Sequence, residues 1–309
     1  MTIPVIAVVG PTASGKSELA IRLAQETGGE IVNADSMQLY RGMDIGTAKL
    51  PPDQRGGIPH HLLDIWDTRH TANVAEYQRL ARAAVEEIRG RGRVPVLTGG
   101  SGLYVRAVLD PLEFPGTDPE LRERLEAELA EAGPAALHAR LAGADPAAAA
   151  AILPSNGRRI IRALEVMELS GHPFTATLPE HESLYPATQI GLRMERAELD
   201  QRITSRAASM FADGLVDEVA ALERAGLREG RTASRALGYA QVLRHLAGEW
   251  TAEDARADTA QATRRFARRQ ESWFRRDPRI TWLEAGGAAR PGLLERALAA
   301  CQAAPLPAG

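Results

Sequence analysis

The stretch that decides the fold is IPVIAVVGPTASGKS, residues 3–17. Its first part, Ile3 to Val9, is apolar on both faces, which is typical of a strand buried inside a parallel sheet. The residues that follow match the pattern G-x-x-x-x-G-K-[ST], and Glu18 to Thr27 is expected to form the helix that this loop opens. Strand, loop and helix in this order predict a phosphate-binding loop at the edge of an α/β sheet.

Each residue type in this loop has a chemical reason. Glycines let backbone N–H groups approach phosphate oxygens, and the lysine adds a positive charge. The hydroxyl of Ser17 is the expected ligand of a Mg²⁺ cofactor. The complete loop consists of Gly10, Pro11, Thr12, Ala13, Ser14, Gly15, Lys16 and Ser17.

A carboxylate is expected opposite this loop. The strand predicted at Glu30 to Ala34 delivers Asp35 to its carboxyl end, where ligands of open parallel sheets bind. The strand predicted at Arg93 to Leu97 ends in TGGSG, without the Mg²⁺-binding Asp of nucleotide hydrolases. Asp35 is therefore either a base facing a second substrate, or a residue that holds a metal-bound water or caps the next segment.

The rest of the chain indicates an insertion in an α/β core. Strands and helices alternate up to about residue 111, and further strands are expected at 61–65, 189–194 and 280–283, as in a doubly wound parallel sheet. Between 117 and 185 the pattern is helical only, with helix starts at Asp118-Pro119 and Asp145-Pro146. The expected parts are a P-loop core (1–116), a helical insertion (117–186) and the second part of the core with C-terminal helices (187–309).

Charge indicates a local surface for a polyanion. The net charge of the chain is −3, so the whole molecule is not a basic nucleic-acid coat. Residues 264–279, however, contain seven arginines against two acidic residues, with Trp273 and Phe274 between them. This mixture suits phosphate contacts and base stacking, although a solvated charged face is the alternative. A second basic cluster, at Arg158, Arg159 and Arg162, favours the first interpretation.

Cysteine and histidine usage argues against other site types. The single cysteine, Cys301, excludes an internal disulfide and a cysteine-rich zinc module. His60 and His61 are adjacent and would point apart on extended chain, so we interpret them as structural. No signal peptide and no apolar run of about 20 residues is recognisable, which favours a cytoplasmic protein.

Several ordered motifs resemble the signature of the tRNA dimethylallyltransferase family. They are DSMQLYRGMDIGTAK (35–49), GGSGLY (99–104), RALEV (162–166), GY (238–239) and RRQESWFR (268–275). The resemblance covers nearly the whole chain and is far more specific than the phosphate loop alone. It corresponds to the compact bacterial form, without the C-terminal zinc finger of eukaryotic relatives.

The resemblance implies an activity. Family members transfer a dimethylallyl group from dimethylallyl diphosphate to the exocyclic amine of the adenine 3′-adjacent to the anticodon, and release diphosphate. The phosphate loop would then hold the prenyl diphosphate with Mg²⁺. Asp35 would accept the proton of the amine, Ser101 would lie beside the target base, and Arg206 would bind the diphosphate. The implied partner is the anticodon stem-loop of tRNA, bound by a monomer.

The resemblance also implies contacts with tRNA from several parts of the chain, including the helical insertion as a clamp on the anticodon arm. The residues concerned are Asp35, Ser36, Met37, Gln38, Ser101, Arg122, Arg158, Arg159, Arg162, Arg235, Gly238, Tyr239, Arg268, Arg269, Gln270, Trp273 and Arg275. Ala240 departs from the basic residue usual in the family, which puts one contact in doubt. Arg202, four residues before Arg206, is expected to pair with Asp200 or another acid on the surface.

Three other functions remain open at this point. A prenyltransferase acting on AMP or ATP would share the phosphate loop but would need neither the insertion nor the C-terminal arginines. A P-loop nucleotide kinase would bind ATP and would need an arginine-rich lid. A non-enzymatic RNA-binding module would have no use for Lys16 and Asp35.

Overall fold

The computed structural model describes residues 3–174 and 181–303. It divides the chain into two compact units, one of Met1–Pro111 with Ser183–Gly309 and the other of Leu112–Glu182. The second unit begins five residues before the predicted start of the insertion, residue 117, and ends four residues before its predicted end, residue 186. No helix within the described residues is long and apolar enough to cross a membrane.

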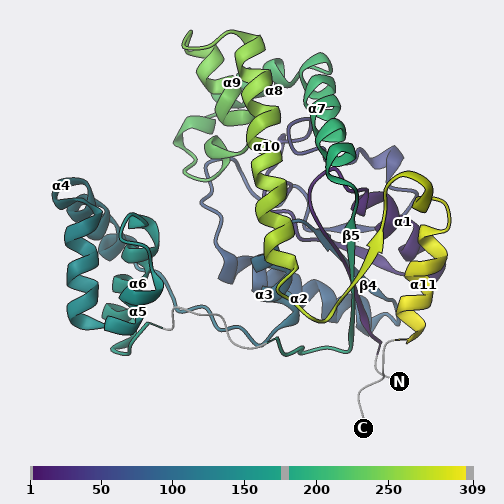
Figure 1. Cartoon of the computed structure of the whole chain (residues 1–309), viewed down its shortest axis with the longest axis horizontal. Helices are drawn as coiled ribbons and strands as arrows, with labels where there is room; N and C mark the ends of the chain where they lie inside the picture. The colour runs from purple at the N-terminus through teal and green to yellow at the C-terminus, as the bar shows by residue number, and fades with distance from the viewer. Residues whose placement is uncertain (1–2, 175–180, 304–309) are drawn as a thin grey trace. The chain divides into compact units, whose positions relative to one another are not determined.

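The first unit is built on a six-stranded parallel sheet in the order β3-β2-β4-β1-β5-β6. The strands are β1 (Val5–Val9), β2 (Glu30–Asn33), β3 (His60–His61), β4 (Pro95–Gly99), β5 (Ala187–Arg193) and β6 (Ile280–Glu284). The doubly wound α/β prediction is confirmed (Figure 1). Because β1 lies between β4 and β5, the loop after β1 sits where the strand order reverses, the usual ligand position of such sheets.

The strand predicted at 61–65 is wrong in extent, since β3 is limited to His60–His61. The backbone turns at Leu62 and Asp64, whose φ angles are 63° and 57°, a region that a strand cannot use. The carbonyl of Leu62 then accepts a hydrogen bond from the Asn33 side chain at 3.0 Å instead of continuing the ladder.

Some helices of the first unit pack on the sheet, and others pack on neighbouring helices. They are α1 (Lys16–Thr27), α2 (Val74–Gly90), α3 (Gly102–Leu109), α7 (Arg196–Ala212), α8 (Leu215–Arg224), α9 (Tyr239–Leu246), α10 (Ala252–Phe274) and α11 (Leu293–Ala303), with short 3₁₀ turns at Pro52–Gln54, Leu227–Glu229, Ala233–Arg235 and Gly287–Ala289. The longest, α10, begins with a capping box in which Thr251 and Asp254 satisfy each other's backbone N–H groups.

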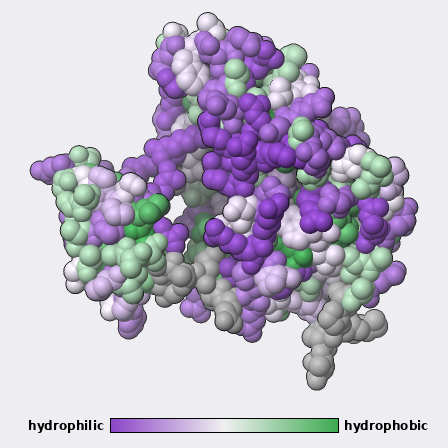
Figure 2. Space-filling model, in the orientation of Figure 1, coloured by the Kyte–Doolittle hydropathy of each residue, from purple (hydrophilic) through white to green (hydrophobic). Residues whose placement is uncertain are grey.

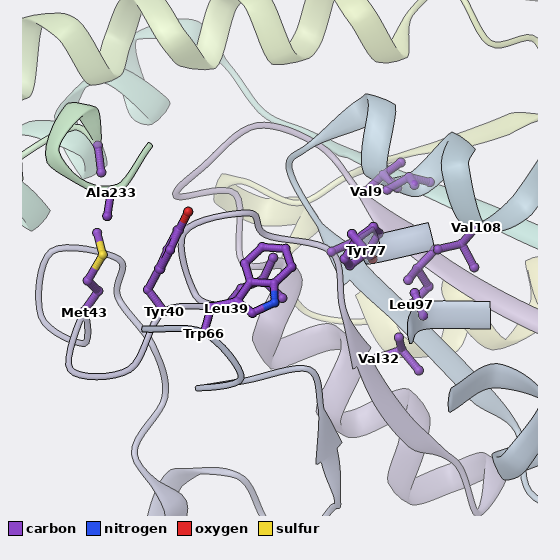
Figure 3. Packing of buried hydrophobic residues seen from close by; sticks show 14 of the residues in the cluster. Val9, Val32, Leu39, Tyr40, Met43, Trp66, Tyr77, Leu97, Val108 and Ala233 are labelled. Carbon is purple, nitrogen blue, oxygen red and sulfur yellow. The ribbon is translucent and has the colours of Figure 1, made fainter. Parts of the chain in front are cut away.

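The apolar run of β1 serves two cores, one on each face of the sheet. Val5, Ala7 and Val9 belong to the larger core, while Ile6 and Val8 belong to the opposite one with α1 and α11. Figure 3 shows part of the larger core, which extends from Val32 and Leu97 at the sheet to side chains of the following loops. This alternation is why the sequence of the strand is apolar without interruption.

The second unit is entirely helical in its described residues. It contains α4 (Pro119–Ala144), α5 (Pro146–Ala151) and α6 (Gly157–Ser170), packed around a leucine- and isoleucine-rich core. The predicted helix starts are confirmed: the carboxylates of Asp118 and Asp145 accept hydrogen bonds from backbone N–H groups of the first turns. Gly133, with φ 80° and ψ 166°, divides α4 into two helical pieces.

Candidate active site

The phosphate loop connects β1 to α1 and passes close to β5. At Gly10, where φ is 138°, a Cβ atom would lie 2.7 Å from the carbonyl oxygen of Leu192, so only glycine fits. Gly15 precedes α1 in the left-handed region, with φ 92°, and allows the loop to turn into the helix. The hydroxyl of Ser17 is exposed on the first turn of α1, where the helix N-terminus favours anions.

Lys16, Asp35 and Arg206 are brought together from α1, the end of β2 and α7. The ammonium group of Lys16 donates to the carbonyl of Pro11 at 2.6 Å. Burial lowers the pKa of Lys16 to about 8; the charge of Asp35 opposes this shift and that of Arg206 adds to it. Lys16 is therefore within electrostatic reach of both charges, and part of its population is neutral at mildly alkaline pH.

Asp35 is held in a defined orientation. Its backbone is fixed by Asn33, whose side chain accepts from the Asp35 N–H at 2.9 Å and donates to the Asp35 carbonyl at 3.0 Å. One carboxylate oxygen accepts from the N–H of Met37 at 2.9 Å. Burial raises the pKa of Asp35, although the Met37 N–H and the charge of Lys16 oppose the shift. A carboxylate with a raised pKa is a stronger proton acceptor.

Ser101 lies beside the residue that follows Asp35. The Ser101 hydroxyl accepts from the N–H of Ser36 at 3.4 Å, and the two hydroxyl oxygens are 3.5 Å apart. Gly99 permits this approach, since a Cβ there would lie 2.2 Å from the carbonyl oxygen of Ala34. The ends of β2 and β4 thus present two hydroxyls and one carboxylate at the same edge of the sheet.

The segment after Asp35 is held in place by side chains that the sequence analysis did not identify. Glu218 of α8 accepts from the backbone N–H groups of Asp44 and Ile45, at 3.1 and 2.8 Å. Lys49 binds the carboxylates of Asp44 and Asp64, at 2.7 and 2.5 Å. Lys49 lies within the quoted motif and was a recognisable signal, whereas nothing in the local sequence around Glu218 indicates its role.

The residues after Asp35 and at Tyr239 that the resemblance assigns to tRNA differ in how accessible their side chains are. The amide of Gln38 donates to the carbonyl of Thr47 at 3.1 Å, and Met37 packs against the larger core. Tyr239 is fully buried and its hydroxyl donates to Glu218 at 2.6 Å. Its ring also fills the space beside Gly46, where a Cβ would lie 2.4 Å from a ring carbon. The Tyr239 side chain therefore supports the 35–49 segment from inside.

Two arginines of α7 have different roles. Arg202 forms an ion pair with Glu198 at 2.7 Å, so the predicted surface pairing of Arg202 is confirmed with an acid one turn before it. Among the described residues Arg206 has no ion-pair partner, and its guanidinium lies near enough to Lys16 to affect the pKa of that lysine. Arg206 is thus available to a ligand of the phosphate loop.

Helix α10 presents several of the predicted basic residues. Arg268 and Arg275 are 63% and 67% exposed, and Figure 2 shows hydrophilic side chains along much of this helix. Trp273 is 37% exposed and lies over Gly102, where a Cβ would approach its ring to 2.0 Å. Gln270, by contrast, is buried and bonded to the main chain at both ends of its amide.

The remaining predicted residues lie around α9, on α10 or in the second unit. Arg235 is exposed in a 3₁₀ turn, and Gly238 (φ 87°) precedes α9; Arg269 lies over the ring of Phe266. In the second unit, Arg158 and Arg159 are exposed on the first turn of α6, whereas Arg122 and Arg162 both bind the buried carboxylate of Glu165, at 2.5 and 2.8 Å.

A pre-formed metal centre is not seen in the described part of the chain, where no three His, Cys, Asp or Glu side chains converge as metal ligands. His61 pairs with Glu30 at 2.7 Å, and His60 with the carbonyl of Ile58 at 2.7 Å. The oxygen donors in and near the phosphate loop include the Ser17 hydroxyl and the Asp35 carboxylate. Such a sparse set suits Mg²⁺, which usually completes its shell with substrate phosphates and water.

A parallel sheet with a phosphate loop, and with Asp35 and Ser101 at the same edge of the sheet, is the arrangement of a P-loop-like α/β protein. The chain belongs to the IPP transferase family, whose model matches residues 38–277.

Relatives of high similarity carry one name. The chain is 67% identical over 300 residues to the tRNA dimethylallyltransferase of Thermobifida fusca, covering 96% of this chain and 93% of the relative. It is 67% identical over 294 residues to the enzyme of the same name from Streptomyces coelicolor, covering 95% and 94%.

Solved structures agree with the fold. The tRNA isopentenylpyrophosphate transferase of Bacillus halodurans is 40% identical, with a TM-score of 0.69 over 97% of this chain and 99% of that one. A eukaryotic dimethylallyltransferase acting on tRNA is 26% identical, with a TM-score of 0.80 over 96% and 78%.

Proposed function

We infer that the chain transfers a dimethylallyl group from dimethylallyl diphosphate to the exocyclic amine of the adenine 3′-adjacent to the anticodon of a tRNA. The observation that carries this inference is that Lys16, in a phosphate loop, lies within electrostatic reach of Asp35 at the end of strand β2. The names of the relatives support the same donor and acceptor.

The reaction forms a bond between the amine nitrogen and the primary carbon of the donor, and it breaks the bond between that carbon and a diphosphate oxygen. The departing oxygen gains negative charge, which the ammonium of Lys16, the guanidinium of Arg206 and loop N–H groups stabilise. The amine loses one proton, and Asp35 accepts it. Asp35 is suited to this role because burial raises its pKa while the Met37 N–H fixes one carboxylate oxygen.

Mg²⁺ is the cofactor that we assign to the donor. The hydroxyl of Ser17 would hold it together with diphosphate oxygens, since Ser17 is exposed on the first turn of α1. When bound, the ion would supply further neutralisation of the leaving group.

The acceptor adenine has to leave its stack before its amine can reach Asp35. Extrusion of a base costs a few kcal/mol and is least costly in a single-stranded loop. The hydroxyls of Ser36 and Ser101 are beside Asp35 and offer hydrogen bonds to an extruded base. Exposed arginines, among them Arg158, Arg235, Arg268 and Arg275, are proposed to bind the phosphates of the anticodon arm. We assign the helical unit to the same arm.

The test is transfer of labelled dimethylallyl diphosphate to unmodified tRNA, with AMP and ATP as competing acceptors. We expect label in tRNA alone, and loss of labelling when the target adenine is replaced by guanine. Label in AMP or ATP would assign the chain to small-nucleotide prenylation. Phosphorylation of an acceptor by ATP would identify a kinase and refute the proposal.

We also propose that the enzyme acts on tRNA in the cytoplasm and that it does so as a monomer. Sedimentation of the protein with one anticodon stem-loop should give a 1:1 complex. A complex of two protein chains and two stem-loops would contradict the proposal that the enzyme acts as a monomer.

A further inference from the structure

We propose that Gln270 is a positioning residue that fixes the distance between the phosphate loop and the Ser101 loop, and that it makes no contact with tRNA. This inference rests on the proposed function, because it assigns the two loops to donor and acceptor. It differs from the family resemblance, which implies an RNA contact for the same residue.

The amide of Gln270 joins the two loops directly. Its Oε1 accepts from the backbone N–H of Thr12, in the phosphate loop, at 2.9 Å. Its Nε2 donates to the carbonyl of Gly100, next to Ser101, at 2.9 Å. Both ends of one planar amide are therefore satisfied by backbone groups, one on each side of the proposed reaction.

Burial excludes a different use of this side chain. Gln270 is 6% exposed, whereas Arg268 on the same helix is 63% exposed. At this exposure a nucleotide has little access to the amide, and displacing either hydrogen bond would leave a buried backbone group unsatisfied.

Glycines show how closely α10 approaches the Ser101 loop. A Cβ at Gly100 would lie 2.1 Å from Nε2 of Gln270, and a Cβ at Gly102 would lie 2.0 Å from the ring of Trp273. Two residues on one face of α10 thus rest on two glycines of one loop. The same helix carries arginines proposed to bind tRNA, so its placement also relates the RNA surface to the reacting groups.

The chemical consequence is alignment. The amine must meet the donor carbon while the diphosphate stays on its loop, and a misplacement of about 1 Å costs on the order of 10²-fold in rate. A side chain that ties Thr12 to Gly100 removes relative movement of the two loops. Since the Thr12 N–H is already occupied, it holds the loop and is not one of the donors that bind phosphate.

The first variant is Gln270→Met, which keeps the length of the side chain and removes both hydrogen bonds. Single-turnover transfer at saturating donor and tRNA should fall on the order of 10²-fold. Diphosphate affinity, measured by calorimetry with diphosphate alone, should weaken about tenfold, while tRNA affinity and its salt dependence stay within about threefold of wild type. The diphosphate measurement needs no transfer, so it remains informative if the proposed acceptor is wrong.

The matched control is Gln78→Met, which removes another amide hydrogen bond between elements, from Gln78 of α2 to the carbonyl of Ala107 in α3 at 2.9 Å. We expect a comparable loss in melting temperature and unchanged transfer. Equal loss of transfer in both variants would reduce Gln270 to an ordinary structural residue. Weaker tRNA binding with unchanged diphosphate affinity would make Gln270 an RNA contact. Either result overturns the proposal.

A second test changes the Ser101 loop at the contact between Gly100 and Gln270. It does not depend on whether the methionine variant folds. Gly100→Ala should slow transfer because its methyl group displaces the Gln270 amide. In a Gln270→Ala background, the same substitution should have no more than about a twofold further effect, since contacting residues are not additive. Full additivity of the two substitutions would contradict the proposal.

Discussion

Asp35 and Glu165 are both acids beside basic groups, yet their surroundings shift their pKa values in opposite directions. Burial by itself raises the pKa of Glu165, but hydrogen bonds from Arg122, Thr117 and Arg162 lower it to about 2. Burial also raises the pKa of Asp35, and there the N–H groups of Met37 and Gln38 and the charge of Lys16 do not reverse the shift. Glu165 forms ion pairs within its unit, whereas Asp35 has no ion-pair partner among the described residues.

The difference separates an acid that stabilises the fold from one that can react. A buried carboxylate bound by two guanidinium groups stays ionised and holds its neighbours in place. A carboxylate with backbone N–H donors and a raised pKa takes a proton more readily. The same distinction applies to arginines: Arg162 is occupied by Glu165 and two carbonyls, whereas Arg206 has no ion-pair partner among the described residues.

The variant with the largest expected effect is Asp35→Asn, which tests whether Asp35 is the reactive acid of the two. The amide keeps an oxygen for the Met37 N–H, so the loop should stay folded, but the base is lost. We expect transfer in single turnover to fall about 10³-fold, with tRNA affinity within an order of magnitude of wild type. A variant that transfers at near the wild-type rate would remove Asp35 from the base role.

The pH–rate profile of the wild-type enzyme sharpens the same point. Because the pKa of Asp35 is raised, its protonation should stop transfer at a pH above the ordinary value of 3.8 for an aspartate. An acidic limb at or below that value would contradict the assignment, provided that circular dichroism shows the protein still folded there.

Lys16 gives the next largest effect. Its cationic form is lost as the pH rises through about 8, so diphosphate affinity should decrease above that pH, by up to about tenfold per unit. Lys16→Met should bind diphosphate about 10- to 100-fold more weakly at neutral pH. Calorimetry between pH 7 and pH 9.5 should measure the diphosphate affinity of both proteins in the same buffers. The methionine variant then accounts for ionisation of the diphosphate itself. Parallel pH curves for the two proteins would exclude Lys16 as the titrating group.

Glu165→Gln tests the paired acid. The folded-state pKa of about 2 lies below the usual 4.5, so the stabilisation is present above pH 4.5 and is lost as the pH falls through about 2. The variant should lose on the order of 3 kcal/mol of unfolding free energy at neutral pH and should show less acid dependence. Denaturant unfolding at pH 7 and pH 3 measures both. In this variant Arg122 and Arg162 lose their shared partner. We nevertheless expect no gain in tRNA affinity, because we interpret both arginines as residues that stabilise the helical unit. A clear gain would contradict that interpretation.

The smallest effect is expected for single exposed arginines. Arg268→Ala should weaken tRNA binding several-fold and reduce the slope of log affinity against log salt by about 1. Arg256, on the same helix and paired with Glu253 at 2.6 Å, provides the control, and Arg256→Ala should leave the slope unchanged. Equal slopes of log affinity against log salt for the two variants would indicate that residues 264–279 form a solvated charged face and not an RNA-binding surface.

The local parts of the fold could be predicted because neighbouring residues decide them. The buried strand at Val5–Val9, the phosphate loop and the helix starts at Asp118 and Asp145 follow from periodicity, glycine geometry and capping. The strand at 61–65 could not be delimited, because side-chain and backbone contacts around Leu62, including one from Asn33, turn the chain out of the sheet.

The electrostatic reading of residues 264–279 was too simple for a related reason. The count of arginines treats them alike, but Arg279 binds the buried carboxylate of Asp110 at 2.8 Å and that of Asp277 at 2.6 Å, and so contributes to packing. Composition reports how many charges a segment has, and only the partners supplied by distant segments decide which of them face solvent.

By itself, the sequence determined a phosphate loop on a buried strand, a carboxylate at the end of the next one and a helical insertion, since each depends on residues close together in the chain. Only the tertiary structure decided that Asp35 has a raised pKa, that Tyr239 supports the 35–49 segment through Glu218, and that Gln270 joins Thr12 to Gly100. These properties depend on burial and on hydrogen bonds between residues far apart in the chain, which local patterns of residue type do not encode.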